Sequence, residues 1–182
     1  MTRKCDGISV GILIWSADRT ELLMIERNTA PAGIACTAGH GDLDNEHPTI
    51  EDVARDEVRE EIGLEVTNLT PLPGGGFHPG LCRRPGSTGH KWHLFEATVT
   101  GHLNASTREV AAVGWWDLIQ IQCLADRTAD HAVGLFTKDE FAARPGLEPV
   151  WCQWMWELGH INLSIQDLAD IKRLAATPPV QR

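Results

Sequence analysis

The sequence predicts an α+β fold in which short strands surround one amphipathic helix and a helical extension follows. Three observations support this prediction. Short apolar runs bounded by turn residues recur through the first two thirds of the chain. A capped helix carrying several glutamates interrupts them, and the C-terminal third contains a tryptophan-rich segment and another capped helix. At 182 residues, the chain is long enough for one domain with a substantial core.

The composition excludes several classes of partner. The formal net charge of −9 disfavours binding to bare nucleic acid or to an anionic membrane. Small phosphorylated substrates stay compatible with it, because a bound divalent cation reverses the local field. No stretch approaches the roughly 20 apolar residues that span a membrane. The five cysteines are scattered without a CxxC pair, so neither a disulfide framework nor a zinc ribbon is suggested, and a cytoplasmic location is expected.

The N-terminal part is predicted to contain three strands. Ile8 to Trp15 and Glu21 to Arg27 are apolar runs joined by turn-prone residues, and Ile34 to Thr37 is a brief third strand. This third strand leads into the glycine turn Ala38–Gly41, where glycine lets the backbone turn sharply or approach a ligand. Within and after this turn, His40 and His47 are interpreted as loop residues rather than ligands.

A helix is predicted from about residue 50 to Ile62. Thr49 and Asp52 have the spacing of a capping box, and Gly63 is suited to end the helix. Three apolar residues form the stripe that packs against the rest of the domain: Ala54, Val58 and Ile62. The adjoining face carries glutamates.

The glutamates of this helix indicate a metal site. Glu57, Glu60 and Glu61 fall within an arc of roughly 100° on one helix face. No basic residue three or four positions away pairs with Glu57 or Glu60 on that face. Carboxylates this close repel one another unless a cation or a shared proton neutralises them. Oxygen ligands without soft partners suit Mg²⁺ or Mn²⁺.

Three further strands are predicted after the helix: Leu64 to Leu69, Trp92 to Thr100, and a strand within Glu109 to Trp116. The Gly/Pro-rich stretch from Pro71 to Lys91 is predicted to lack regular structure. This stretch is the most basic part of the chain. It is either a solvated surface loop or a substrate loop that contacts phosphate or ribose.

The C-terminal third is predicted to be helical in part. Ile119 to Arg144 is ambiguous, with a helical piece near residues 138–143, and a helix is expected at residues 150–158. Ser164 begins a final helix to about Ala175. The tryptophans Trp151, Trp154 and Trp156 either pack internally or form a homodimer interface. We therefore expect one domain over residues 1–182, with a core at about 7–125 and a helical extension at about 126–176.

The segment Gly39–Leu64 resembles the signature of the Nudix hydrolases, G-x5-E-x7-R-E-U-x-E-E-x-G-U, where U is aliphatic. Six residues match its C-terminal half: Glu57, Val58, Glu60, Glu61, Gly63 and Leu64. Asp56 stands in place of the signature's arginine, and the loop is longer by one residue from Gly41 or by three from Gly39. The signature's first glutamate falls on Pro48, and Glu46 is the only nearby substitute. Either a distant arginine replaces the missing one, or activity is weakened; the three candidates are Arg27, Arg83 and Arg84.

The resemblance implies an α/β/α sandwich with a mixed sheet. It implies hydrolysis, dependent on Mg²⁺ or Mn²⁺, of a pyrophosphate bond in a nucleoside diphosphate linked to another moiety. One alternative is a catalytically weak or silent Nudix-like domain that binds or senses nucleotides. Another is a reader of RNA, which the acidic composition disfavours. A small nucleotide-type molecule is thus the expected partner.

The resemblance also implies roles for single residues. Glu57 and Glu61 are the first-choice metal ligands, completed by a backbone carbonyl near Gly39. Glu60 is a further ligand or orients water. The general base comes either from the helix or from a later residue, for which Glu109 is the candidate. Substrate contacts are assigned to three residues: Arg83, Arg84 and Trp115.

Overall fold

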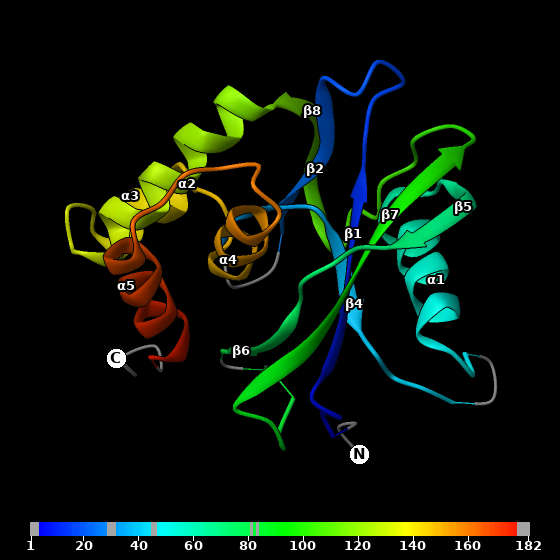
Figure 1. Ribbon diagram of the computed structural model, residues 1–182, viewed down its shortest axis with the longest axis horizontal. Coiled ribbons are helices and arrows are strands. Elements are labelled where there is room, and N and C mark those ends of the chain that lie inside the picture. The colour runs from blue at the N-terminus through cyan, green and yellow to red at the C-terminus, as the bar shows by residue number, and fades with distance from the viewer. Residues whose placement is uncertain (1–3, 29–31, 45–46, 81, 83, 178–182) are drawn as a thin grey trace.

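A five-stranded mixed sheet forms the centre of the molecule (Figure 1). The computed structural model describes residues 4–28, 32–44, 47–80, 82 and 84–177. The strands of this sheet are β1 (Ile8–Ile14), β4 (Thr37–His40), β5 (Glu65–Pro71), β6 (Gly76–Pro79) and β7 (Gly89–Thr100). β1 pairs parallel with β7 and antiparallel with β4, while β5 and β6 each pair antiparallel with β7. The predicted mixed sheet is confirmed.

Three more strands form a second, antiparallel sheet: β2 (Glu21–Arg27), β3 (Ile34–Ala35) and β8 (Val110–Asp117). Its order is β3-β2-β8. The extension meets the edge strand β3, because the backbone N–H of Ile34 donates to the Gly146 carbonyl over 2.8 Å. The backbone N–H of Glu148 in turn donates to the Ile34 carbonyl, also over 2.8 Å. These bonds place Glu148 beside the end of β2.

Helices lie on both sides of the strands (Figure 1). α1 (Ile50–Ile62) covers one side, and the C-terminal helices lie on the other. The C-terminal helices are α2 (Leu118–Ala132), α3 (Lys138–Ala143), α4 (Pro149–Glu157) and α5 (Ile165–Ala176). This layering confirms the predicted α+β architecture with a C-terminal helical extension. None of the helices among the described residues is long and apolar enough to cross a membrane.

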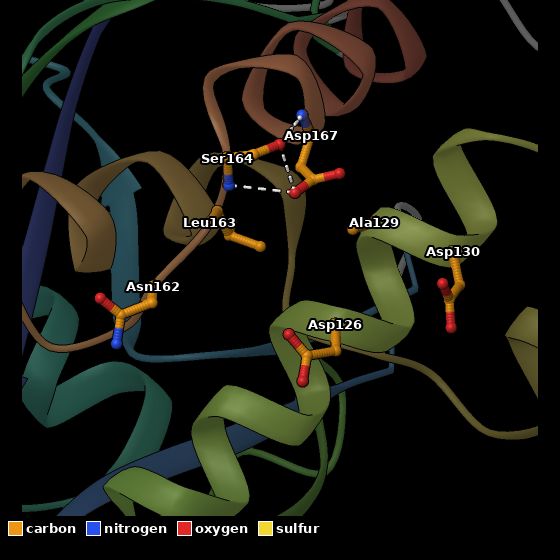
Figure 2. Close-up of a pocket in the computed structure, with 7 residues that line it drawn as sticks. All are labelled: Asp126, Ala129, Asp130, Asn162, Leu163, Ser164 and Asp167. Carbon is orange, nitrogen blue, oxygen red and sulfur yellow. Dashed lines mark hydrogen bonds between the residues drawn. The ribbon is translucent and has the colours of Figure 1, made fainter.

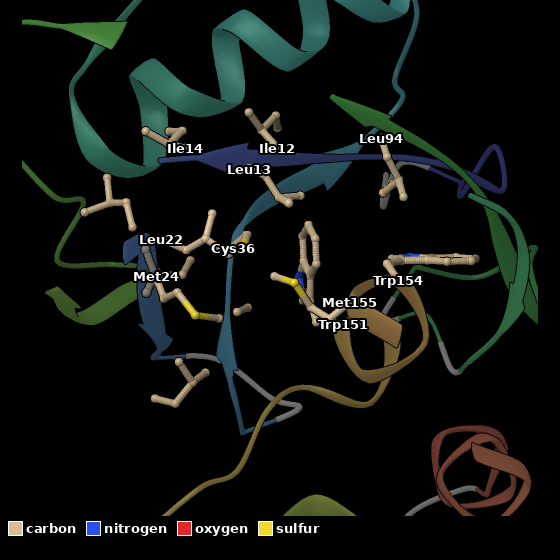
Figure 3. Close-up of a cluster of buried hydrophobic side chains, with 14 of the residues drawn as sticks. Ile12, Leu13, Ile14, Leu22, Met24, Cys36, Leu94, Trp151, Trp154 and Met155 are labelled. Carbon is tan, nitrogen blue, oxygen red and sulfur yellow. The ribbon is translucent and has the colours of Figure 1, made fainter. Parts of the chain in front are cut away.

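The two faces of β1 pack against different helices (Figure 3). Ile12 and Ile14 point toward α1, whereas Leu13 points toward Trp151 of α4. A Cβ on Gly11 would come within 2.8 Å of the Trp151 ring, so only glycine lets this ring approach the strand. Trp151 and Trp154 are buried within this chain, which agrees with the interpretation that they pack internally.

The helix boundaries follow the predicted capping residues. Thr49 and Ser164 each accept from the backbone N–H three residues later, and the acid at that position bonds back. A third capping box, which the sequence analysis did not identify, joins Asp117 to Gln120. It begins α2, which occupies the first half of the stretch that was ambiguous from sequence.

The prediction that residues 71–91 lack regular structure is wrong in part. This stretch contains β6 and the first residues of β7, and β5 extends to Pro71. Gly76 aligns with Trp92, and Pro79 with Gly89. A strand in this position is stabilised by backbone pairing to its neighbour and needs no apolar alternation of its own. The interpretation of His40 as a loop residue is also wrong, because it is the last residue of β4.

Candidate active site

α1 packs against the central sheet with its apolar face. The predicted stripe of Ala54, Val58 and Ile62 is buried, and so is Val53. At the C-terminal end, Gly63 adopts φ 73°, a conformation that favours glycine, and closes the helix by bonding to the Arg59 carbonyl. With this face buried, the adjoining glutamate face lies along β4.

Two of the glutamates contact the backbone of β4. The Glu57 carboxylate lies so close to Gly39 that a Cβ on Gly39 would overlap with it. The Glu61 carboxylate accepts a hydrogen bond from the Ala38 N–H over 3.1 Å. The structure therefore brings together Glu57, Glu61 and the Ala38–Gly39 backbone, and only a residue without a side chain fits at position 39.

Burial raises the pKa of both carboxyl groups. Glu61 is 5% exposed, and this burial together with the charge of Glu57 raises its pKa well above the usual value. The pKa of Glu57 is raised to about 7, first by burial and then by the charges of Glu60 and Glu109. Two neighbouring acids, one buried and one half-buried, repel each other when ionised and would be stabilised either by protons or by a cation.

Glu60 and Glu109 lie at the edge of this pair. Glu60 is exposed, one residue before the buried Glu61. Glu109 lies before β8, in a segment that is attached to the end of α1 because the Ser106 N–H donates to the Glu61 carbonyl over 2.8 Å. The Glu109 side chain is 35% exposed, and its charge raises the pKa of both Glu57 and Glu61. The structure thus places both residues within electrostatic reach of the pair, in contact with solvent.

Two of the three candidate arginines lie near the carboxylates. The charge of Arg27 lowers the pKa of Glu61, and its guanidinium lies 3.5 Å from Glu148. Arg84 forms an ion pair of 2.5 Å with Asp42, and its charge lowers the pKa of Glu57. The positive charge of each arginine therefore partly offsets the negative charge of one of the two glutamates. The third candidate, Arg83, lies outside the described residues, as does Glu46.

Asp56 occupies the position of the signature's arginine and binds local partners instead. The His47 ring nitrogen lies 2.9 Å from its carboxylate, and Arg59 pairs with it one turn along the helix. The Arg55 side chain donates to the Val66 carbonyl over 2.8 Å. Both helix arginines are thus bound away from the glutamate pair, as their positions on the helix predict.

Trp115 lies on β8 with 40% of its surface exposed, opposite Leu23 of β2. Its indole ring is therefore accessible to a ligand from solvent. Its neighbour Trp116 packs against the core.

An acidic hollow between α2 and α5 is a poor candidate for an anionic substrate (Figure 2). Three aspartates line it: Asp126, Asp130 and Asp167. Asp167 is already bonded to Ser164 as part of a helix cap, as Figure 2 shows. None of the residues that line this hollow belongs to α1 or β4. The glutamate pair remains the candidate site.

One charged neighbour of the site was missed from the sequence. Glu148 is buried, and burial raises its pKa although Arg27 lies beside it. The sequence did contain a signal for this residue: Glu148 is an acidic residue among apolar ones, directly before the proline that begins α4. This residue links the helical extension to the candidate active site through Arg27.

The site fits a hard divalent cation. Its donors are carboxylate oxygens and the backbone of a glycine strand, and their mutual repulsion is what a bound cation would relieve. Glu57 and Glu61 would hold the ion, with Glu60 at the rim.

The fold and the glutamate pair together define a Nudix-type hydrolase architecture. The family model described as NUDIX domain matches residues 6–136, which is more than half of the chain. The chain therefore belongs to the Nudix family. This confirms the predicted resemblance and, at the level of the family, the prediction of a Nudix-type pyrophosphohydrolase that acts on nucleotide derivatives.

Solved structures show the same fold. A MutT NUDIX hydrolase from Burkholderia pseudomallei is 22% identical, with a TM-score of 0.50, over 62% of this chain and 83% of that one. A MutT protein from Methanosarcina mazei Go1 is 20% identical, with a TM-score of 0.50, over 68% and 85%. The NUDIX domain of Shewanella oneidensis NrtR, complexed with ADP ribose, is 13% identical, with a TM-score of 0.51, over 66% and 77%. No curated protein sequence matches the chain significantly.

The contact between Gly39 and Glu57 can be tested by Gly39→Ala. The added methyl group must displace the carboxylate or the strand, so we expect a loss of about 1–3 kcal/mol in the free energy of unfolding, measured by urea denaturation. Gly80→Ala is the matched control, because a Cβ there meets no atom within 4 Å. In a double-mutant cycle, Glu57→Ala should remove most of the cost of Gly39→Ala. Equal costs with and without Glu57 would contradict the contact.

Proposed function

We propose that the chain hydrolyses a pyrophosphate bond in a nucleoside diphosphate linked to another moiety, using Mg²⁺ or Mn²⁺ held by Glu57 and Glu61. The observation that carries this proposal is the pair of carboxylates, Glu61 buried and Glu57 half-buried, against the β4 backbone. Membership of the Nudix family supports the reaction class. The free thiols of all five cysteines agree with the expected cytoplasmic location.

The residues around the pair have separate roles in this proposal. When bound, the divalent ion supplies charge for the phosphoryl oxygens and makes its bound water more acidic. Glu57 and Glu61 hold the ion, and Glu60 is a third ligand or orients water from its exposed position. We assign the general base to Glu109, because its side chain reaches solvent while its charge acts on both Glu57 and Glu61.

We assign the role of the signature's missing arginine to Arg27. Its charge favours the ionised form of Glu61, which is the form that binds a cation. Its buried Nε has no hydrogen-bond partner among the described residues, so the guanidinium retains a donor. The Glu148 carboxylate lies 3.5 Å from the Arg27 guanidinium and offsets its charge. Arg27 is a positioning residue in this account, since it acts through Glu61.

Substrate contacts are proposed for Arg84 and Trp115, with Arg83 as a candidate outside the described residues. Arg84 is already anchored by Asp42 beside Glu57, where a phosphate would approach the ion. The exposed Trp115 ring offers a face on which a base could stack. The NrtR domain, whose structure contains ADP ribose, shares this fold. Adenine nucleotides with a linked sugar should therefore be included in the substrate screen.

The first test is hydrolysis of nucleoside triphosphates, dinucleotides and nucleotide sugars with Mg²⁺ or Mn²⁺. We expect turnover of at least one class and a loss of about 10²-fold or more in kcat/KM for Glu61→Gln, because a neutral amide binds the ion weakly. Glu109→Gln should lower kcat by about 10²–10⁴-fold, as expected for loss of a general base. Glu65→Gln, an exposed glutamate just beyond α1, is the control and should retain activity.

Two outcomes of this screen would contradict the proposal. Undiminished activity of Glu61→Gln would remove the assigned site. Nucleotide binding without turnover on any substrate would instead favour the silent binding domain, the alternative that Asp56 and the lengthened loop raise.

The role of Arg27 predicts a shifted pH profile. Without its charge the pKa of Glu61 rises further, so the acidic limb of the kcat/KM profile should move to higher pH in Arg27→Gln and stay in place in Arg27→Lys. Adding Glu148→Gln to Arg27→Gln avoids leaving a buried unpaired carboxylate that could unfold the protein. Arg59→Gln, which removes an exposed arginine of α1, is the control. A profile unchanged by the loss of Arg27 would contradict this role.

A further inference from the structure

Four side chains that no motif connects meet at one end of the central sheet. Cys5 precedes β1, His40 ends β4, Cys82 lies between β6 and β7, and His90 is near the start of β7. Their two sulfur atoms and two ring nitrogens all lie within 4.8 Å of one another. Two thiols and two imidazoles converging in this way form a complete set of ligands for a tetrahedral metal ion.

The distances within the cluster are close to those of a zinc site. The Cys5 Sγ lies 3.1 Å from the His90 Nε2, and the Cys82 Sγ lies 3.2 Å from the His40 Nε2. In a tetrahedral site with Zn–S of about 2.3 Å and Zn–N of about 2.0–2.1 Å, sulfur and nitrogen ligands are about 3.6 Å apart. A small outward movement of each side chain would therefore admit the ion.

Groups around the cluster orient the ligands. The backbone N–H of Gly7 points to the Cys5 Sγ and that of Arg84 to the Cys82 Sγ, each over 3.3 Å. The Ser9 hydroxyl lies 2.6 Å from the His90 Nδ1, which directs the other ring nitrogen into the cluster. Donors to thiolates and a hydrogen bond on the second nitrogen of a histidine are the outer contacts that protein metal sites use.

We propose that Cys5, His40, Cys82 and His90 bind a structural Zn²⁺ ion. Sulfur and imidazole ligands select zinc over the hard ions that suit the glutamate pair. Two thiolates offset the charge of the ion, so the site is neutral when filled. Four protein ligands leave no open position for substrate, which makes the role structural rather than catalytic.

The ion would stabilise the neighbourhood of the active site. His40 directly follows Gly39, the residue against which Glu57 packs. Arg84 lies two residues after Cys82 and pairs with Asp42 beside Glu57. Zinc would thus join the N-terminal segment, β4 and the β6–β7 connection, and hold Arg84 where its charge acts on the catalytic helix.

The spacing of the ligands explains why the sequence did not suggest this site. Gaps of 34, 41 and 7 residues separate Cys5, His40, Cys82 and His90, and no CxxC pair is present. The pairing of β1 with β4 and β7, together with that of β6 with β7, brings the four side chains together. The expectation of no zinc ribbon concerned local motifs, and this site is built from distant segments.

The test is the metal content of the full chain, expressed with zinc in the medium and purified without chelator. We expect about one zinc ion per chain by inductively coupled plasma mass spectrometry, and loss of most of it in Cys82→Ser and Cys5→Ser. Cys123→Ser, which changes an exposed free thiol of α2, is the matched control and should retain the ion. Glu61→Gln should also retain it, which separates this site from the catalytic one.

A second measurement covers the case in which the cysteine variants fail to fold. Co²⁺ bound to the wild-type chain should show the visible absorption of a tetrahedral thiolate complex, and Zn²⁺ should abolish it. Three results would overturn the proposal: zinc retained in Cys82→Ser, cobalt spectra without thiolate ligation, or a Cys5–Cys82 disulfide without zinc in a non-reducing peptide map.

Discussion

The close approach of α1 to the β4 backbone is the contact on which the rest of the site depends. Gly39 leaves the space that the Glu57 carboxylate fills, and the Ala38 N–H fixes Glu61. Burial makes both acids costly in their ionised form, which is why the pKa of Glu57 rises to about 7. A bound cation would relieve this cost, so the same packing that raises the Glu57 pKa would favour metal binding at the site.

Two arginines partly offset the negative charge of Glu57 and Glu61. Arg27 acts on Glu61 and is itself offset by Glu148, which the C-terminal extension supplies. Arg84 acts on Glu57 and is held by Asp42, beside the proposed zinc ligands. Segments far apart in the chain thus meet at the site. The extension is therefore part of the electrostatic environment of α1, and it contributes Trp151 to the core.

Local patterns in the sequence predicted the helix, its caps and its glutamate face, because these depend on residues within a few turns of one another. They did not predict β6, which is held by its pairing with β7 rather than by its own composition. The Glu148–Arg27 pair and the cysteine–histidine cluster were missed for the same reason: each joins residues that only the assembled sheets bring together. The sequence identified Arg27 and Arg84 as candidates, but it did not identify Glu148 and Asp42, the acids with which they pair.

The affinity for Mg²⁺ as a function of pH tests the central claim most directly. Below the Glu57 pKa of about 7 the ion must displace a proton from Glu57, and the raised pKa of Glu61 adds a second proton, so affinity should rise with pH. We expect calorimetric titration to show a gain of at least about tenfold per pH unit on the acidic side, and proton release on binding, both reduced in Glu57→Gln. An affinity that is independent of pH, or unaffected by the loss of both Glu57 and Glu61, would contradict the account.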